Sequence, residues 1–169
     1  MKPPYSVPVR LHQIGARLER RLEPSENERA KIAKELDLAE LPYLAADVVV
    51  EVTSSGWKLS GRIEAEGAQT CGITLEPLPI RFDEAFSLNF AEVTEEKAGE
   101  DDEIDIDMDD DTPDLIDDGQ IDLGVYLVEQ LALRLDPFPR KPGAVFEQPP
   151  EPAEISPFAV LKRLDPGKA

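Results

Sequence analysis

The sequence is poor in the residues from which most active sites and metal sites are built. Its 169 residues include one cysteine, Cys71, and one histidine, His12. A single cysteine cannot form an intramolecular disulfide, so nothing indicates an oxidising compartment. Zinc needs about three or four nitrogen or sulfur ligands, more than this pair supplies. The chain also has no glycine-rich phosphate loop and no Gly-x-Ser-x-Gly motif. We therefore predict a protein that is not an enzyme and uses no metal or cofactor.

Long apolar runs are missing as well. No stretch approaches the roughly 20 apolar residues that a membrane helix needs, and the N-terminal MKPPYSVPVR has no apolar signal core. These absences predict a cytoplasmic protein with no membrane partner and no small-molecule substrate.

Negative charge is present in excess, and it is concentrated in one segment. The formal net charge is −18, and residues 92–118 carry −14 of it, with 15 acidic residues against one lysine. A run of like charges repels itself and has little to bury, so we predict that most of this segment is disordered. Ile104, Ile106 and Met108 alternate with acids inside it, which leaves a short, weak edge strand as an alternative.

Apolar residues at every second position predict the strands of a half-buried sheet. The first such run covers residues 5–11, where Pro8 favours an edge position. Two more runs, at 48–52 and 57–65, flank a Ser54-Ser55-Gly56 turn and predict a hairpin.

A further alternating run at 80–90 predicts the next antiparallel strand. Glu84 interrupts its apolar side, and a bulge near Glu84–Ala85 would restore the alternation. The sheet should therefore have at least three consecutive strands, with residues 5–11 as a fourth.

Two helices should cover one face of this sheet. Ser25 can cap the first, with Glu28 reaching back to it, and the helix would run to about Leu36. Asp122 is a suitable N-cap for the second, in which leucines recur every four residues from Leu123 to Leu135.

These elements predict one α+β domain, residues 1–145, interrupted by the flexible acidic segment 92–118. Its core would be a twisted antiparallel sheet of about four to six strands packed with two helices, and closure into a barrel remains an alternative. Residues 146–169 are predicted to be a proline-rich tail with a short apolar motif, SPFAVLKRL.

The candidate site residues each have a structural and a functional interpretation. Cys71 is either a nucleophile or a small buried apolar residue, and we favour the second because no base or further ligand accompanies it. Arg17, Arg20 and Arg21 are either a basic patch for phosphates or an acidic partner, or a solvated connector, which we favour. These three arginines would form one larger basic patch only if the fold places them beside Arg134, Arg140 and Lys141.

The acidic segment does not predict a calcium site. Asp105, Asp107 and Asp109 match the first three ligand positions of an EF-hand loop. The sixth position is then Asp110 instead of glycine, and the twelfth is Ile116 instead of glutamate. The bend and the bidentate ligand that such a loop needs are both missing.

Three motifs carry a family resemblance. Residues 71–77, Cys-Gly-Ile-Thr-Leu-Glu-Pro, match a Cys-x-x-Cys-Leu-Glu-Pro motif, with Thr74 in place of its second cysteine. Residues 118–133 lead from Asp-Gly-Gln-Ile-Asp-Leu into Glu-Gln-Leu-Ala-Leu, and residues 136–142 are Asp-Pro-Phe-Pro-Arg-Lys-Pro. Together they resemble the bacterial and plastid domain family that contains the large ribosomal RNA subunit accumulation protein YceD.

The resemblance implies a non-enzymatic accessory factor for 23S ribosomal RNA accumulation and large-subunit biogenesis. Such a factor would bind ribosomal precursor RNA, a basic ribosomal protein or an assembly factor. If relatives hold zinc or a redox pair at the first motif, Thr74 excludes the same arrangement here. The resemblance implies binding roles for the motif residues Cys71, Leu75, Glu76, Pro77, Asp122, Leu123, Glu129, Arg140 and Lys141.

The acidic charge supports an alternative function. A strongly negative chain can occupy the nucleic-acid site of a basic DNA- or RNA-binding protein and so inhibit or regulate it.

Overall fold

A computed structural model of the chain describes residues 2–92, 113–116 and 118–149. Its main body is a five-stranded sheet in the order β2-β3-β4-β5-β6. These strands span Arg17–Leu22 (β2), Leu38–Thr53 (β3), Gly56–Thr70 (β4), Pro77–Glu92 (β5) and Asp114–Ile116 (β6).

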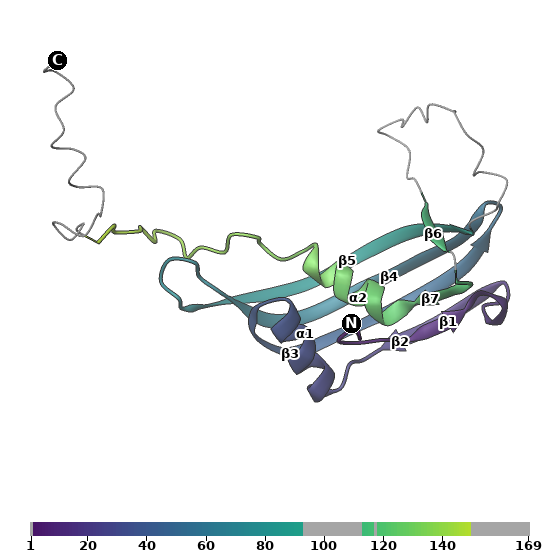
Figure 1. Ribbon diagram of the computed structural model, residues 1–169, viewed down its shortest axis with the longest axis horizontal. Helices are drawn as coiled ribbons and strands as arrows, with labels where there is room; N and C mark the ends of the chain where they lie inside the picture. Colours follow the sequence, from purple (N-terminus) through teal and green to yellow (C-terminus); the bar gives the residue numbers. More distant parts are fainter. Residues whose placement is uncertain (1, 93–112, 117, 150–169) are drawn as a thin grey trace, which may run out of the picture.

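A smaller sheet and two α-helices accompany this body (Figure 1). The smaller sheet pairs β1 (Pro8–Arg10) with β7 (Gln120–Asp122), and a 3-10 turn, η1 (Leu11–Gln13), follows β1. The helices are α1 (Glu26–Glu35) and α2 (Leu123–Ala132). The predicted α+β class with two helices is confirmed.

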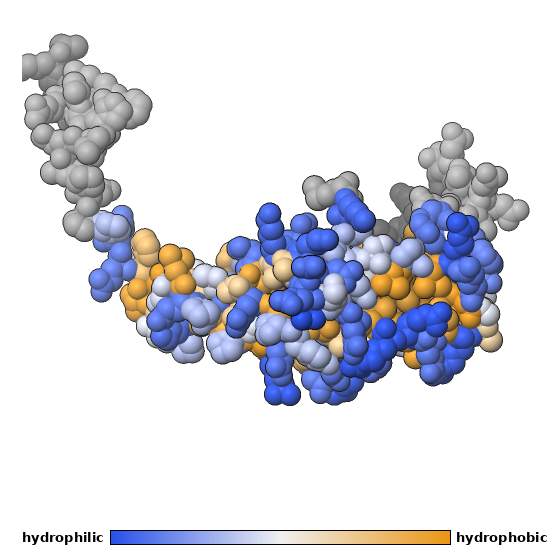
Figure 2. Space-filling view, turned by 90° about the horizontal axis from the view of Figure 1, so that it is seen from below, coloured by the Kyte–Doolittle hydropathy of each residue, from blue (hydrophilic) through white to orange (hydrophobic). Residues whose placement is uncertain are grey.

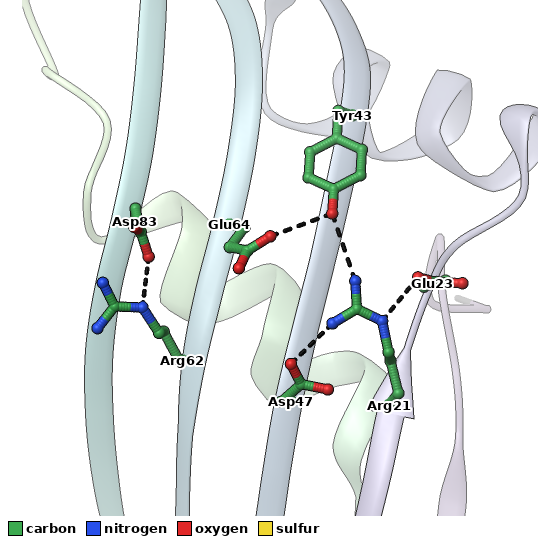
Figure 3. A network of polar contacts seen from close by, with 7 residues as sticks. All are labelled: Arg21, Glu23, Tyr43, Asp47, Arg62, Glu64 and Asp83. Carbon is green, nitrogen blue, oxygen red and sulfur yellow. Dashed lines mark hydrogen bonds and ion pairs between the residues drawn. The ribbon is translucent and has the colours of Figure 1, made fainter.

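The helices leave one face of the large sheet open. Helix α1 packs on β3, and α2 packs on β4 and β1. Figure 3 shows the opposite face, with polar side chains in front of the strands and the green α2 behind them. Antiparallel sheets tolerate one solvated face, which is why their strands alternate between apolar and polar residues.

The predicted hairpin is formed by β3 and β4. Thr53 pairs with Gly56, so Ser54 and Ser55 make a two-residue loop. Gly56 has φ of 148°, and a Cβ atom there would collide with the backbone carbonyl of Phe90 on the next strand. Only glycine fits this position, for steric as well as conformational reasons.

Helix α1 begins as its capping residues predict. The Glu28 carboxylate accepts hydrogen bonds from the Ser25 backbone N–H at 2.8 Å and from the Ser25 hydroxyl at 2.7 Å. These bonds hold the pKa of Glu28 below its ordinary value, with the hydroxyl contributing most. The helix ends at Glu35, next to Leu36, as expected.

The leucine stripe of α2 faces the core. Leu123, Leu127 and Leu131 are each no more than 1% exposed. Burial of one such side chain contributes roughly 2 kcal/mol. The ring of Tyr126 meets Phe90 of β5 edge-on, with centroids 4.9 Å apart.

Helix α2 is shorter than predicted. It ends at Ala132, and Leu135 lies in the following turn, where it is only partly buried. Beyond the helix, the Arg134 N–H donates to the Leu131 carbonyl and the Leu135 N–H donates to the Ala132 carbonyl. These bonds join residues three positions apart instead of four, a tighter turn that is common at the end of a helix. Periodicity alone does not reveal where that tightening begins.

The large sheet differs from the predicted antiparallel sheet at one edge. Strand β6 runs parallel to β5, with Phe90 opposite Asp114, so the sheet is mixed. It is also open, because no strand of the described residues joins β2 to the β5–β6 side. The barrel alternative is therefore wrong.

The N-terminal strand was assigned to the wrong sheet. Only Pro8–Arg10 of residues 5–11 is extended, and it pairs with β7 instead of joining the large sheet. The vacant place next to β3 is taken by β2, where the sequence predicted a connector. Arg20 stands on the apolar side of β2 and disrupts the alternation by which the strand would have been identified.

The bulge predicted near Glu84–Ala85 is absent. Pairing between β4 and β5 runs without interruption from Thr70 opposite Pro77 to Trp57 opposite Phe90. Glu84 stays on the covered face, where its carboxylate lies 3.0 Å from the guanidinium of Arg134. A cross-layer ion pair, not a bulge, accommodates the charge.

The acidic segment is described only in part. Asp114–Ile116 forms β6, so these residues are an ordered part of a segment that was predicted to be mostly disordered. Residues 93–112 lie outside the described residues, together with the Ile104–Met108 alternation and the tested EF-hand positions 105–110. The apolar motif at 156–164 lies outside them too, and the domain boundaries stay predictions.

Candidate functional site

The loop of residues 71–76, here called the knuckle, joins β4 to β5. The Cys71 N–H donates to the Glu76 carbonyl at 2.9 Å, and the Leu75 N–H donates to the Cys71 carbonyl at 3.0 Å. The Cys71 sulfur accepts from the N–H groups of Ile73 at 3.5 Å and Thr74 at 3.4 Å. Cys71 is fully buried, as its structural interpretation predicts, and its sulfur organises the loop.

Residues 136–141, the exit segment, are bonded along the knuckle. The Gly72 N–H donates to the Pro139 carbonyl at 2.9 Å, and the Lys141 N–H donates to the Cys71 sulfur at 3.3 Å. The Gln69 side chain bonds both the carbonyl and the N–H of Asp136, at 2.8 and 3.2 Å. Two motifs that are about 65 residues apart in the sequence therefore form one unit.

An ion pair closes this unit. The Lys141 ammonium lies 2.7 Å from the Glu76 carboxylate. This hydrogen bond is the main reason that the pKa of Glu76 is lowered and that of Lys141 is raised. Four motif residues, Cys71, Leu75, Glu76 and Lys141, are thus neighbours, and Arg140 precedes the last of them on the exposed surface.

The environment of Cys71 favours the thiolate. Hydrogen bonding to Thr74, through its side chain first and then its backbone, lowers the pKa of the Cys71 thiol to about 6 together with the Lys141 and Ile73 amides. Burial opposes this shift but does not cancel it. Thr74, which stands at the position of the second cysteine of the family motif, therefore hydrogen-bonds Cys71, the first cysteine of that motif.

Leu75 stands at the exposed tip of the knuckle in an unusual conformation. Its φ is 59°, and the residue is 75% exposed. A left-handed conformation costs a non-glycine residue roughly 1–2 kcal/mol. No burial compensates for this cost, so the leucine is positioned for something other than the core.

Further apolar side chains are exposed at and beyond the exit segment. Figure 2 shows hydrophobic residues gathered where this segment leaves the body of the molecule. The sequence analysis gave this stretch a family motif and a proline-rich composition but did not predict an exposed apolar surface on it. The large exposed hydrophobic side chains of the knuckle and of this region are Leu75, Phe138, Val145 and Phe146.

The motif residues of α2 have structural roles. The Asp122 carboxylate accepts from the N–H groups of Gly124 and Val125 and caps the helix as predicted. Leu123 is buried in the core. A ten-residue helix is about 15 Å long, so this end of α2 lies well away from the knuckle, which neighbours the residues that follow the helix.

The remaining knuckle-motif residue, Pro77, is the first residue of β5 and lies opposite Thr70 of β4.

Glu129 differs from its neighbours on α2 because it points to the surface. Partial burial first, and then the nearby Asp114, raise its pKa. Asp114, Glu129 and Asp118 also raise the pKa of Tyr126 beyond the effect of burial. Three acids, from β6, from the turn before β7 and from α2, therefore influence the same side chain, Tyr126.

The fold does not bring Arg17 and Arg21 to Arg134 and Lys141, which was the condition for one larger basic patch. On the open face, Arg21 pairs with Asp47 and Glu23, each at 2.7 Å (Figure 3). Arg17 pairs with Glu51 on the same face, at 2.8 Å. Arg134 instead reaches the covered side of β5, and Lys141 reaches the knuckle.

Only part of one motif lines a hollow of the surface that the structure describes. One hollow of about 760 Å³ lies along α1 between Glu26 and Pro42 and contains no motif residue. A smaller one of about 310 Å³ separates the exit segment from Leu36 and Asp37 and is lined by Gln69 and Pro139. Among the described residues, no cluster of three acidic, histidine or cysteine side chains is placed to hold a metal ion.

No described helix is long and apolar enough to cross a membrane. The comparisons with curated proteins and with solved structures gave no match. A family model described as the large ribosomal RNA subunit accumulation protein YceD matches residues 59–165, more than half of the chain. The match begins within β4 and includes the knuckle, α2 and the exit segment, whereas β1, β2, α1 and β3 precede it. The chain therefore belongs to the YceD family.

Proposed function

We propose that this protein is a non-enzymatic accessory factor for 23S ribosomal RNA accumulation and large-subunit biogenesis, and that it acts by binding. The family assignment supports the ribosomal role. The mode of action is our inference from the motif residues, which build contact surfaces and a scaffold.

The conformation of Leu75 carries this proposal. A family-motif leucine that is strained, apolar and 75% exposed gains nothing within its own chain. Such outliers persist where a partner makes use of them. The neighbouring Glu76–Lys141 pair and the Cys71 hydrogen bonds hold the backbone on which Leu75 stands.

The surroundings of Cys71 and His12 argue against an enzyme. Cys71 is fully buried beneath the exit segment, although its pKa is low. His12 lies in η1, beside the turn that precedes β7, because the neighbouring Leu11 N–H bonds the Gly119 carbonyl. The two residues therefore sit near opposite ends of α2, whereas a nucleophile and its base must be in contact.

The partner that fits the charge is a basic protein. Residues 92–118 carry a net charge of −14, and Arg17 and Arg21 are already paired with carboxylates on the open face. RNA binding relies on unpaired lysine and arginine, which makes direct RNA contact the weaker choice. We infer a cytoplasmic ribosomal protein or assembly factor as partner, in keeping with the family's role.

The acidic group around Tyr126 favours one alternative. Asp114, Asp118 and Glu129 converge there, as they would on a surface that mimics nucleic acid toward a basic DNA- or RNA-binding protein. Affinity purification from cells after mild cross-linking separates the two functions. Large-subunit proteins and precursor RNA in stoichiometric amounts support the first, and one nucleic-acid enzyme without ribosomal components supports the second.

A further inference from the structure

We propose that the free edge of β5 between Phe86 and Asn89 binds an extended segment of a basic protein as an added strand. The inference rests on the proposed function and specifies where the basic partner binds. It follows from the direction of the backbone groups of β5, from the distribution of edge protection, and from the charge beside the edge.

Two hydrogen bonds, one just before β5 and one in its middle, show which residues face outward. The Glu76 carbonyl bonds Cys71 at the β4 end of the knuckle, so even-numbered residues direct their backbone groups toward β4. The Ala85 carbonyl instead accepts from the Arg134 guanidinium at 3.2 Å, outside the β4–β5 ladder. Because the strand repeats every two residues, Ser87 and Asn89 also face outward.

The first half of this edge is protected against strand addition. Pro77 and Pro79 occupy outward positions and have no N–H to donate. Arg81 and Asp83 follow with charged side chains, and Arg134 covers the Ala85 carbonyl. Natural sheets use such devices to prevent unwanted pairing.

The second half lacks this protection. Residues 86–89 contain no charged residue and no proline. Among the described residues, only β6 pairs with the outer side of β5, and it does so at Phe90–Glu92 (Figure 1). By contrast, four of the six residues of β2, the opposite edge strand, are charged. The backbone groups of Ser87 and the N–H of Asn89 are therefore available to an incoming strand, whereas the parallel register with β6 occupies the Asn89 carbonyl.

The charge beside this stretch selects a basic occupant. Helix α2 runs along β5, since Tyr126 meets Phe90 and Arg134 meets Glu84, and Glu129 lies between these two contacts. Asp114 on β6 lies close enough to raise the pKa of Glu129, and no described lysine or arginine is in ion-pair contact with either acid. Two copies of this chain would bring these acids together and repel each other, which disfavours self-pairing through β5.

The test uses the full-length protein and a fluorescein-labelled seven-residue peptide of alternating lysine and valine, with glutamate replacing lysine in a control peptide. Fluorescence anisotropy should show binding of the lysine peptide and at least about tenfold weaker binding of the glutamate peptide. Ser87→Pro removes an outward N–H at a position equivalent to Pro79 and should weaken binding about tenfold. Ser87→Ala keeps the N–H and should bind within about twofold of wild type.

A second measurement does not depend on a variant that folds. In the wild-type protein, the lysine peptide should slow hydrogen exchange at the Ser87 and Asn89 amides, while the Phe86 and Leu88 amides are already protected by β4. Equal binding by Ser87→Pro and Ser87→Ala, unchanged exchange at Ser87, equal affinity for both peptides, or a dimer that Ser87→Pro dissociates would each overturn the inference.

Cells separate this inference from the function on which it rests. If loss of the protein lowers 23S relative to 16S ribosomal RNA and folded Ser87→Pro restores the ratio fully, the edge site is wrong and the function stands. If loss of the protein leaves the ratio unchanged, the proposed function itself fails.

Discussion

Replacing Asp122 tests whether this family-motif residue has a structural role. One carboxylate oxygen accepts from the N–H groups of Gly124 at 3.0 Å, Val125 at 3.2 Å and Val7 at 2.7 Å. The other accepts from the Ser6 hydroxyl at 2.5 Å. The residue thus caps α2 and also ties the N-terminal segment to it.

The magnitude follows from these bonds. Loss of an N-cap costs about 1 kcal/mol, and a partly buried N–H left without an acceptor costs about 1–3 kcal/mol more. Asp122→Ala should therefore lower the free energy of unfolding by roughly 2–4 kcal/mol. Asp122→Asn retains an oxygen that can accept the same three bonds and should cost less than about 1 kcal/mol.

Urea denaturation followed by circular dichroism measures both variants. With a slope of roughly 1–3 kcal/mol per molar urea, the alanine variant should shift the midpoint by about 1–2 M. An alanine variant as stable as wild type would refute the structural role. An asparagine variant that loses as much as alanine would show that charge, not the hydrogen-bond acceptor, is what matters.

Two further predictions concern Cys71 and Gly124. The folded-state pKa of the Cys71 thiol, about 6, lies below its ordinary value of 9.0, so the thiolate stabilises the fold at alkaline pH, and this contribution is lost as pH falls through 6. As pH rises from 6 to 9, the free energy of unfolding of wild type should increase relative to that of Cys71→Ala, and the thiolate absorbance at 240 nm should titrate near pH 6. Stability curves of the two proteins that stay parallel over this pH range, together with a thiolate titration midpoint near pH 9, would contradict the prediction. A Cβ atom at Gly124 would lie 2.8 Å from the Ser6 Cα, so Gly124→Ala should cost about 1–3 kcal/mol in the same urea assay. An unchanged midpoint would show that the segment before β1 is not held against α2 as described.

Elements with strong local signals could be predicted from the sequence. The Ser25–Glu28 cap, the Ser54–Ser55 turn and the leucine stripe of α2 depend on residues within a few positions of each other, and the structure has all three. The parallel pairing of β6 could not be predicted, because Asp114–Ile116 is too short for periodicity and its partner lies across residues 93–112.

The candidate site was only partly accessible to sequence reasoning. Motif resemblance identified Cys71 and Lys141, but not that the Lys141 N–H bonds the sulfur of Cys71. Nothing in the sequence distinguishes Leu75, which is exposed and strained, from Leu123, which is buried. That difference depends on backbone conformation, which hydropathy does not report. Whether Arg17 and Arg21 are free or paired likewise depends on their cross-strand neighbours, Glu51 and Asp47, which the sequence does not reveal.

The ratio of 23S to 16S ribosomal RNA in cells depleted of this protein tests the central claim most directly. Depletion should lower the ratio, and expression of the wild-type chain should restore it. A folded Leu75→Ser variant should restore it only in part, because the exposed leucine is proposed to contact the partner. A ratio that stays constant through depletion would contradict the account.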